Sequence, residues 1–166
     1  MAKPEVWMRG AVPGVDPWLQ PVVHSLLQSR EELDAVLSSC TDAQLWLRPG
    51  GAASIAYHVD HIGGSLDRLL TYARGESLTP AQFAALKEEG QGTTRTTADL
   101  LTGVQGAIDR AVAQVQATAH EALLEPRRVG RAGHPSTVLG LLFHAAEHAL
   151  RHAGQAVTTA RVVAIL

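Results

Sequence analysis

The chain has 166 residues, so we expect one domain over residues 1–166. Its formal net charge is −2 at pH 7 and its basic residues gather on no helix face, so we expect that it binds no nucleic acid. Hydrophobic residues make up 46% of the sequence, but no apolar run approaches the roughly 20 residues of a membrane span, which predicts a cytoplasmic protein that does not enter a membrane. Cys40 is the only cysteine, which excludes internal disulfides and thiolate metal clusters.

The first half of the sequence is patterned for helices, because its apolar residues recur at intervals of three and four. A first helix is predicted over Asp16–Ser38, with an aspartate as N-cap and a proline at the first helical position. A connector rich in proline and glycine follows over Thr41–Gly51. A second helix is predicted over Ala52–Arg74, and its apolar spacing alternates between four and three, as left-handed bundle packing requires.

The connection after the second helix is about twenty residues long, which is too long for a simple turn. Within it, Thr79–Gln82 has the pattern of a capping box and predicts a short helix that ends at Gly90. Gln91–Arg95 is polar and is expected to be a linker. The sequence therefore predicts a long crossover that carries one short helix.

The second half of the sequence predicts two more long helices. The third runs from Thr96 or Thr97 to about Ala119, and a loop rich in glycine and arginine is expected over Arg127–Pro135. The fourth begins near Ser136 and continues to at least Gln155, with Val163 as an alternative end. Four long amphipathic helices with one long crossover predict an all-α fold, a four-helix bundle.

Three of the eight histidines lie four residues apart on the predicted fourth helix, so they share one face. On a helical wheel, His148 and His152 fall at the inner edge of the apolar arc, whereas His144 turns outward toward Glu147 and Arg151. Two imidazoles at positions i and i+4 can bind one metal ion together. The alternative is a pair of half-buried, hydrogen-bonded histidines or a solvated helix edge.

The second helix carries two further histidines, His58 and His61. The wheel places His58 at about 70° and His61 at about 130° from the centre of the apolar stripe, so periodicity favours His58 as the inward residue. However, His61 shares its face with polar, small and aromatic residues that suit a cavity wall. They are Ser54, Tyr57, Gly64, Ser65, Arg68 and Tyr72. Gly63 and Gly64 lower helix stability and indicate a close approach to another group.

A histidine followed by an aliphatic residue in the second helix, together with Glu-His-x-x-x-His-x-Gly-Gln in the fourth, resembles the DinB-like (YfiT-like) superfamily. The two segments here are His58–Ser65 and Glu147–Gln155, and the resemblance covers nearly the whole chain. It implies an up-down-down-up four-helix bundle in which one histidine of helix two and two of helix four hold a metal ion. Aligned on these motifs, the implied ligands are His61, His148 and His152, with His58 as the alternative to His61.

The resemblance also implies a chemistry. Three neutral histidines suit Zn²⁺ or Ni²⁺, with Fe²⁺ as a further candidate, and they leave a coordination position open for water or substrate. Members of the family with known roles include thiol-S-transferases that use low-molecular-weight thiols such as bacillithiol or mycothiol, and related isomerases. We therefore expect a metal-dependent thiol-S-transferase or hydrolase that acts on a small electrophile. The alternative is a non-catalytic, metal-stabilised binding or stress-response module.

Residues around the implied ligands are candidates for the cavity wall or for hydrogen bonds to the ligands. They are His58, Tyr57, Ser65, Arg68, His144, Glu147, Arg151 and Gln155. For Glu147 and Gln155 the alternatives are a surface salt bridge and a polar helix end.

We also expect a homodimer, as is common in this family. The apolar residues Leu139, Phe143 and Leu150 lie to one side of the fourth helix, beyond its core-facing arc, and Ala160–Leu166 is also apolar. The alternative is that the fourth helix simply contacts two neighbouring helices.

Overall fold

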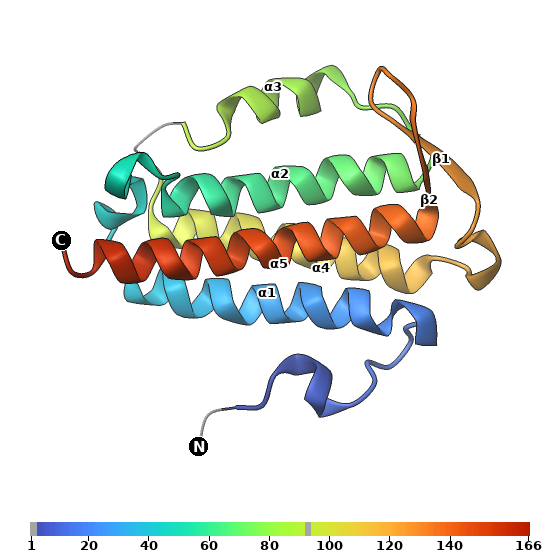
Figure 1. The fold of residues 1–166 in the computed structure, drawn as a ribbon, viewed down its shortest axis with the longest axis horizontal. Helices are drawn as coiled ribbons and strands as arrows, with labels where there is room; N and C mark the ends of the chain where they lie inside the picture. The colour runs from blue at the N-terminus through green and yellow to red at the C-terminus, as the bar shows by residue number, and fades with distance from the viewer. Residues whose placement is uncertain (1–2, 92–93) are drawn as a thin grey trace.

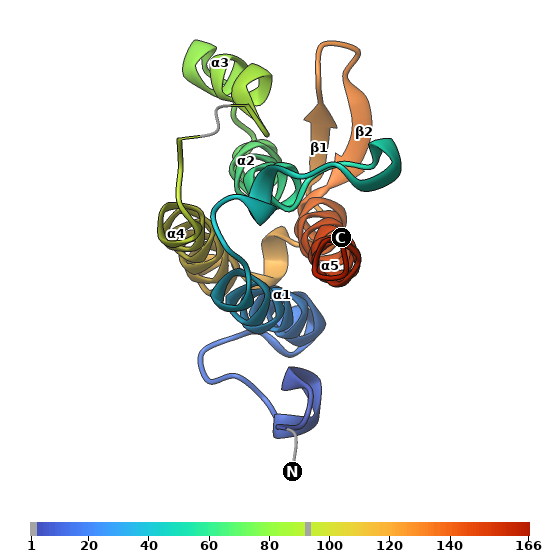
Figure 2. The same cartoon turned by 90° about the vertical axis from the view of Figure 1, so that its left-hand side faces the viewer.

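A computed structural model describes residues 3–91 and 94–166. Four long helices lie side by side in it (Figures 1 and 2), namely α1 (Gln20–Ser39), α2 (Ile55–Ala73), α4 (Thr97–Ala117) and α5 (Val138–Val163). Each of α1 and α2 packs against both α4 and α5. In Figure 1, α2 and α4 run from left to right, and α1 and α5 run in the opposite direction. The four predicted long helices are therefore all present.

The long crossover between α2 and α4 contains the predicted short helix, α3 (Pro80–Glu88). Thr79 and Gln82 form both hydrogen bonds of the predicted capping box at its start. In Figures 1 and 2, α3 lies beside α2 on the outside of the four long helices. The crossover therefore returns the chain along the outer face of α2 before α4 begins.

Two helix starts differ from their predictions because of local capping. Asp16 caps a 3₁₀ turn, accepting a hydrogen bond from the Trp18 backbone, so α1 proper begins four residues later at Gln20. Ser54 caps α2 by accepting from the Tyr57 backbone, so that helix begins at Ile55 and not at Ala52. The 3₁₀ turns of the described residues are Val6–Arg9, Pro17–Leu19, Gln44–Trp46, Pro49–Gly51 and His120–Ala122.

The segment predicted as a glycine- and arginine-rich loop over Arg127–Pro135 is instead part of a β-hairpin, which adds a small sheet to the predicted helical fold. β1 (Pro126–Val129) pairs antiparallel with β2 (His134–Thr137). Gly130 and Gly133 turn the chain with φ of 67° and 64°, a conformation that favours glycine. The strands are only four residues long and have no apolar alternation, so no strand signal was present in the sequence. The described part of the chain is mostly helical with one small sheet.

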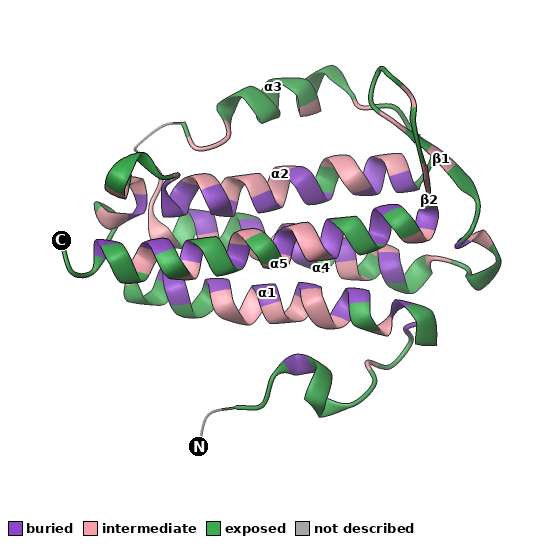
Figure 3. Cartoon of the chain, viewed as in Figure 1, coloured by how far each residue is buried: buried purple, intermediate pink, exposed green. Residues whose placement is uncertain are grey.

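The core lies between the long helices, and Figure 3 shows buried positions along the sides that face one another. Helix α5 contributes mainly small residues to it, and these are Ala145, Ala146, Ala149, Ala153 and Ala156. Small side chains allow neighbouring helices to approach closely, so α5 packs tightly between α1 and α2. None of the helices in the described part of the chain has the length and apolarity needed to cross a bilayer.

Candidate metal centre

Three histidines from two helices converge where α2 packs against α5. One ring nitrogen each of His61, His148 and His152 lies within 4.8 Å of the other two. The Nε2 atoms of His61 and His148 are 2.9 Å apart. The ring centroids of His61 and His148 both lie 4.6 Å from the centroid of His152. The structure thus brings together the three residues that the sequence motifs singled out.

The opposite directions of α2 and α5 explain this convergence. His58 and His61 are one turn apart on α2, and His148 and His152 are one turn apart on α5. Because the helices run in opposite directions, His61 meets His148 while His58 meets His152. The wheel's preference for His58 agrees with its burial, since His58 is 6% exposed. Both histidines of α2 nevertheless face α5.

His58 contacts the His152 ring. Its Nδ1 lies 3.1 Å from the Nδ1 of His152, so the Nε2 of His152 is the nitrogen left to face the other ligands. Burial lowers the pKa of His58, and the nearby His61 lowers it further. His58 is therefore a neutral partner that fixes the orientation of the His152 ring.

His148 and His152 on α5 are also neutral at pH 7. Burial, followed by the charge of His61, lowers the pKa of His148 and of His152 to about 4. Arg151 lowers both values further. An imidazole must be unprotonated to bind a metal, so these rings are ready to act as ligands near neutral pH.

Glu89, the residue that follows α3, also belongs to the site, and the sequence analysis did not identify it. Its Oε2 lies 2.7 Å from the Nδ1 of His61, and its Oε1 accepts a 2.6 Å hydrogen bond from Arg68. Burial raises the pKa of Glu89, but the hydrogen bonds from His61 and Arg68 outweigh it and the pKa is lowered. The carboxylate is therefore ionised, and it contacts the Nδ1 of His61 while the Nε2 of that ring faces His148.

The other predicted wall residues take different positions. Tyr57 stacks on His61 with ring centroids 5.5 Å apart and planes 6° apart, and Arg68 reaches His61 only through Glu89. Ser65 is buried and its hydroxyl donates to the Ile62 carbonyl within the same helix. Tyr57 thus covers one face of the His61 ring, whereas the Ser65 hydroxyl forms a hydrogen bond within α2.

On α5, the predicted outer residues form a group of their own. Glu147 lies 2.7 Å from the Nδ1 of His144 and accepts a 2.9 Å hydrogen bond from Arg151. Arg151 also lies 3.2 Å from the Nδ1 of His148. Gln155 is exposed one turn below this group. Glu147 therefore bonds to surface residues of its own helix and not to the three convergent histidines.

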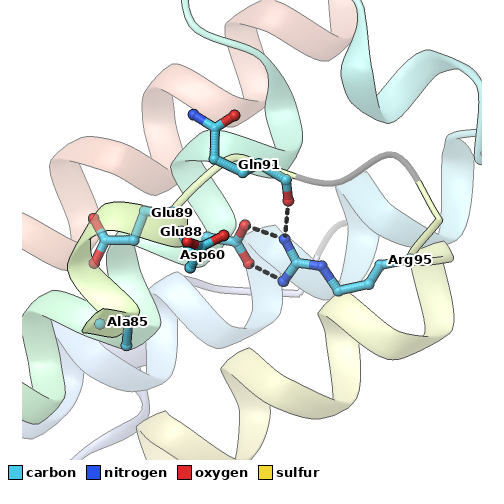
Figure 4. A pocket seen from close by; sticks show the side chains of 7 residues that line it. Asp60, Ala85, Glu88, Glu89, Gln91 and Arg95 are labelled. Carbon is cyan, nitrogen blue, oxygen red and sulfur yellow. Dashed lines mark hydrogen bonds and ion pairs between the residues drawn. The ribbon is translucent and has the colours of Figure 1, made fainter. Parts of the chain in front are cut away.

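A cavity of about 430 Å³ lies next to Glu89, between α2, α3 and the start of α4 (Figure 4). Arg95 closes one side by donating to both carboxylate oxygens of Asp60, at 2.7 and 2.6 Å, and to the Gln91 carbonyl. The lining residues are Asp60, Gly64, Ala85, Glu88, Glu89, Gln91 and Arg95. The cavity adjoins the histidine site through Glu89.

The fold and the site together define a helical protein with a three-histidine candidate metal site. Residues 25–156 match the family model of the DinB superfamily, and the chain belongs to that superfamily, as the histidine motifs indicated. A crystal structure of a conserved protein from Enterococcus faecalis shares the fold, with 18% identity and a TM-score of 0.74 over 89% of this chain and 98% of that one. No curated protein matches this chain.

Proposed function

We propose that the protein is a cytoplasmic metal-dependent enzyme, an up-down-down-up four-helix bundle in which His61, His148 and His152 hold one divalent ion. The convergence of three half-buried imidazoles, two of them with a depressed pKa, is the observation that carries this proposal. Nitrogen donors of this kind suit Zn²⁺ or Ni²⁺, with Fe²⁺ as a further candidate. Three protein ligands leave a position open to water or substrate, which is typical of catalytic and not structural sites.

The neighbouring residues support a reactive centre. A divalent ion in this site would lower the pKa of a water molecule or a thiol and so make a nucleophile available at neutral pH. The Arg151 side chain is 53% exposed and contacts His148, which places a positive charge at the rim of the site. That charge suits the carboxylate of a low-molecular-weight thiol. We therefore propose transfer of such a thiol to a small electrophile, or hydrolysis, as the reaction.

A turnover screen tests this proposal. The protein, loaded with Zn²⁺ or Ni²⁺, is incubated with several small thiols and with epoxides, chlorinated aromatics or hydrolysable esters, and thiol or ester consumption is followed. We expect turnover that is lost on chelation and in His148→Ala. Metal that raises the unfolding temperature without turnover of any substrate would favour the non-catalytic, metal-stabilised module.

We also propose a homodimer. Phe143 on α5 is 59% exposed, and Trp7 and Trp18 near α1 are 63% and 66% exposed. Val163 is buried, whereas Ile165 and Leu166 are each 84% exposed. Large exposed apolar groups are typical of contact surfaces. Light scattering at micromolar concentration should give twice the monomer mass of 17.6 kDa, and a constant monomer mass on concentration would contradict the dimer.

A further inference from the structure

We infer that Glu89 is the positioning residue that prepares His61 for metal binding, and that Gly64 provides the space for its carboxylate. This inference rests on the proposed metal site. It assigns part of the control of metal affinity to the crossover between α2 and α4, because Glu89 lies just beyond α3 and 28 residues from His61 in the sequence.

The hydrogen bonds of Glu89 fix which nitrogen of His61 faces the ion. One carboxylate oxygen is 2.7 Å from the Nδ1 of His61, and the other accepts from Arg68 at 2.6 Å. The three side chains are 18%, 8% and 11% exposed for His61, Glu89 and Arg68. An ionised carboxylate only accepts hydrogen bonds, so Nδ1 carries the proton and the lone pair lies on Nε2. That Nε2 atom faces His148.

Gly64 shows that this part of α2 is shaped around the carboxylate. A Cβ atom at position 64 would lie 2.1 Å from the Oε1 of Glu89 and 2.7 Å from Arg68. At the adjacent Gly63, the nearest atom is the Cβ of Ala107 at 3.9 Å, which is an ordinary contact. The close approach that the glycine pair indicated in the sequence is therefore the approach of Glu89, and it requires only Gly64.

Gly90, the residue after Glu89, holds the backbone of this segment close to α2. Its φ is 69°, and a Cβ there would lie 2.8 Å from the Tyr57 ring, so only glycine brings the chain this close to α2. The Gly90 backbone also donates to Asp60 at 3.0 Å. The residue that follows Glu89 is thus anchored to α2 independently of the His61 contact. This anchor holds the carboxylate behind the His61 ring.

The first test measures Zn²⁺ affinity of the full chain by competition with a chromogenic chelator. Glu89→Ala should weaken binding by about 10–100-fold, the usual effect of losing a residue that orients a metal ligand. Glu89→Gln should weaken it less, because its amide oxygen can still accept from the Nδ1 of His61. Glu88→Gln is the matched control, since Glu88 is an exposed neighbour on the same cavity, and its affinity should stay within twofold of the wild type.

The second test leaves Glu89 and every histidine unchanged. Gly64→Ala should displace the carboxylate and weaken Zn²⁺ binding, whereas Gly63→Ala should bind as the wild type does. The visible absorption of Co²⁺-loaded protein reports the arrangement of the ligands, and it should change in Gly64→Ala and Glu89→Ala but not in the two controls. Circular dichroism checks that every variant is folded.

The outcomes separate this inference from the proposed function. If the wild type binds no Zn²⁺, or if His61→Ala binds it equally well, the proposed metal site is wrong and the inference is overturned with it. If the wild type and His61→Ala behave as proposed but Glu89→Ala and Gly64→Ala bind normally, the inference alone is overturned. Equal losses in Glu88→Gln and Gly63→Ala would indicate a general effect of charge or helix packing and would also overturn it.

Discussion

Helix α5 carries two groups of metal-binding residue types that differ in their surroundings. His148 and His152 face α2 and converge with His61. His144 and Glu147, with His148, form a second group whose ligand atoms also lie within 4.8 Å of one another, but it lies on a single helix. The His144 and Glu147 side chains are 49% and 36% exposed, and Arg151 already pairs with the glutamate.

The difference shows that spacing alone does not make a metal site. The same interval of four residues separates His144 from His148 and His148 from His152. His148 and His152 pair with His61 and His58 of α2, and burial at this helix contact keeps the two rings neutral. His144 and Glu147 are more exposed to solvent, and Arg151 pairs with Glu147. We therefore expect one functional site, formed by His61, His148 and His152.

The largest difference is expected on removing one histidine from each group. His152→Ala should lose stoichiometric metal, because it removes a ligand and leaves His58 without its partner. His144→Ala should retain one equivalent, because His144 pairs with Glu147 and lies outside the group formed by His61, His148 and His152. Elemental analysis of the purified, dialysed proteins checks both. Equal losses in the two variants would contradict the distinction between the groups.

Metal binding should also stabilise the fold, because the convergent histidines join α2 to α5. At a free Zn²⁺ concentration 100 times the Kd, the expected gain is about 2.7 kcal/mol. For a chain of this length, that gain raises Tm by about 5–10 °C. Thermal unfolding followed by circular dichroism, with and without EDTA, measures the shift. His144→Ala should show the full shift and His152→Ala almost none, and a shift of equal size in both would place the ion in the wrong group.

The stability of the metal-free protein should fall as the pH is lowered from 7 to 4. His148 and His152 have a pKa of about 4 in the folded state, below the ordinary value of 6.5 expected on unfolding. The unfolded chain therefore binds more protons in this range, so these residues favour unfolding increasingly below pH 6.5, until the pH reaches about 4. Urea unfolding across this range checks the trend. The double variant His148→Ala/His152→Ala should show a weaker pH dependence, and an unchanged dependence would refute this origin.

The smallest effect is expected in the outer group. Glu147→Gln removes an exposed ion pair between residues four apart on one helix, so it should change the free energy of unfolding by only about 0.3–0.5 kcal/mol. Zn²⁺ affinity should be unaffected, because Glu147 bonds to His144 and Arg151. Urea unfolding and chelator competition measure the two quantities. A tenfold loss of affinity would show that Glu147 supports the site after all.

Much of this arrangement could be predicted from the sequence. Apolar spacing identified the four long helices, and the Thr79–Gln82 capping box located α3. The wheel correctly separated His144 from the inner pair, because exposure on one helix follows directly from its angle. The hairpin escaped prediction because its strands are short and polar, and their pairing depends on the turn between Gly130 and Gly133.

The missed part of the site depends on contacts between distant segments. Glu89 lies in the crossover, and no periodic pattern connects it with His61 on another helix. The single trace in the sequence was the glycine pair in α2, which indicated a close approach without naming the approaching group. The wheel could not decide between His58 and His61, because it does not show which residue of a neighbouring helix each ring meets. In the structure both rings reach α5, where His58 meets His152 and His61 meets His148.

The most direct test of the central claim is an anomalous difference map from a crystal of the Zn²⁺-loaded protein, measured at the zinc absorption edge. We expect one peak per chain, bound by the imidazoles of His61, His148 and His152 at about 2.0–2.1 Å. A peak bound by His144 and Glu147, with none between α2 and α5, would contradict it.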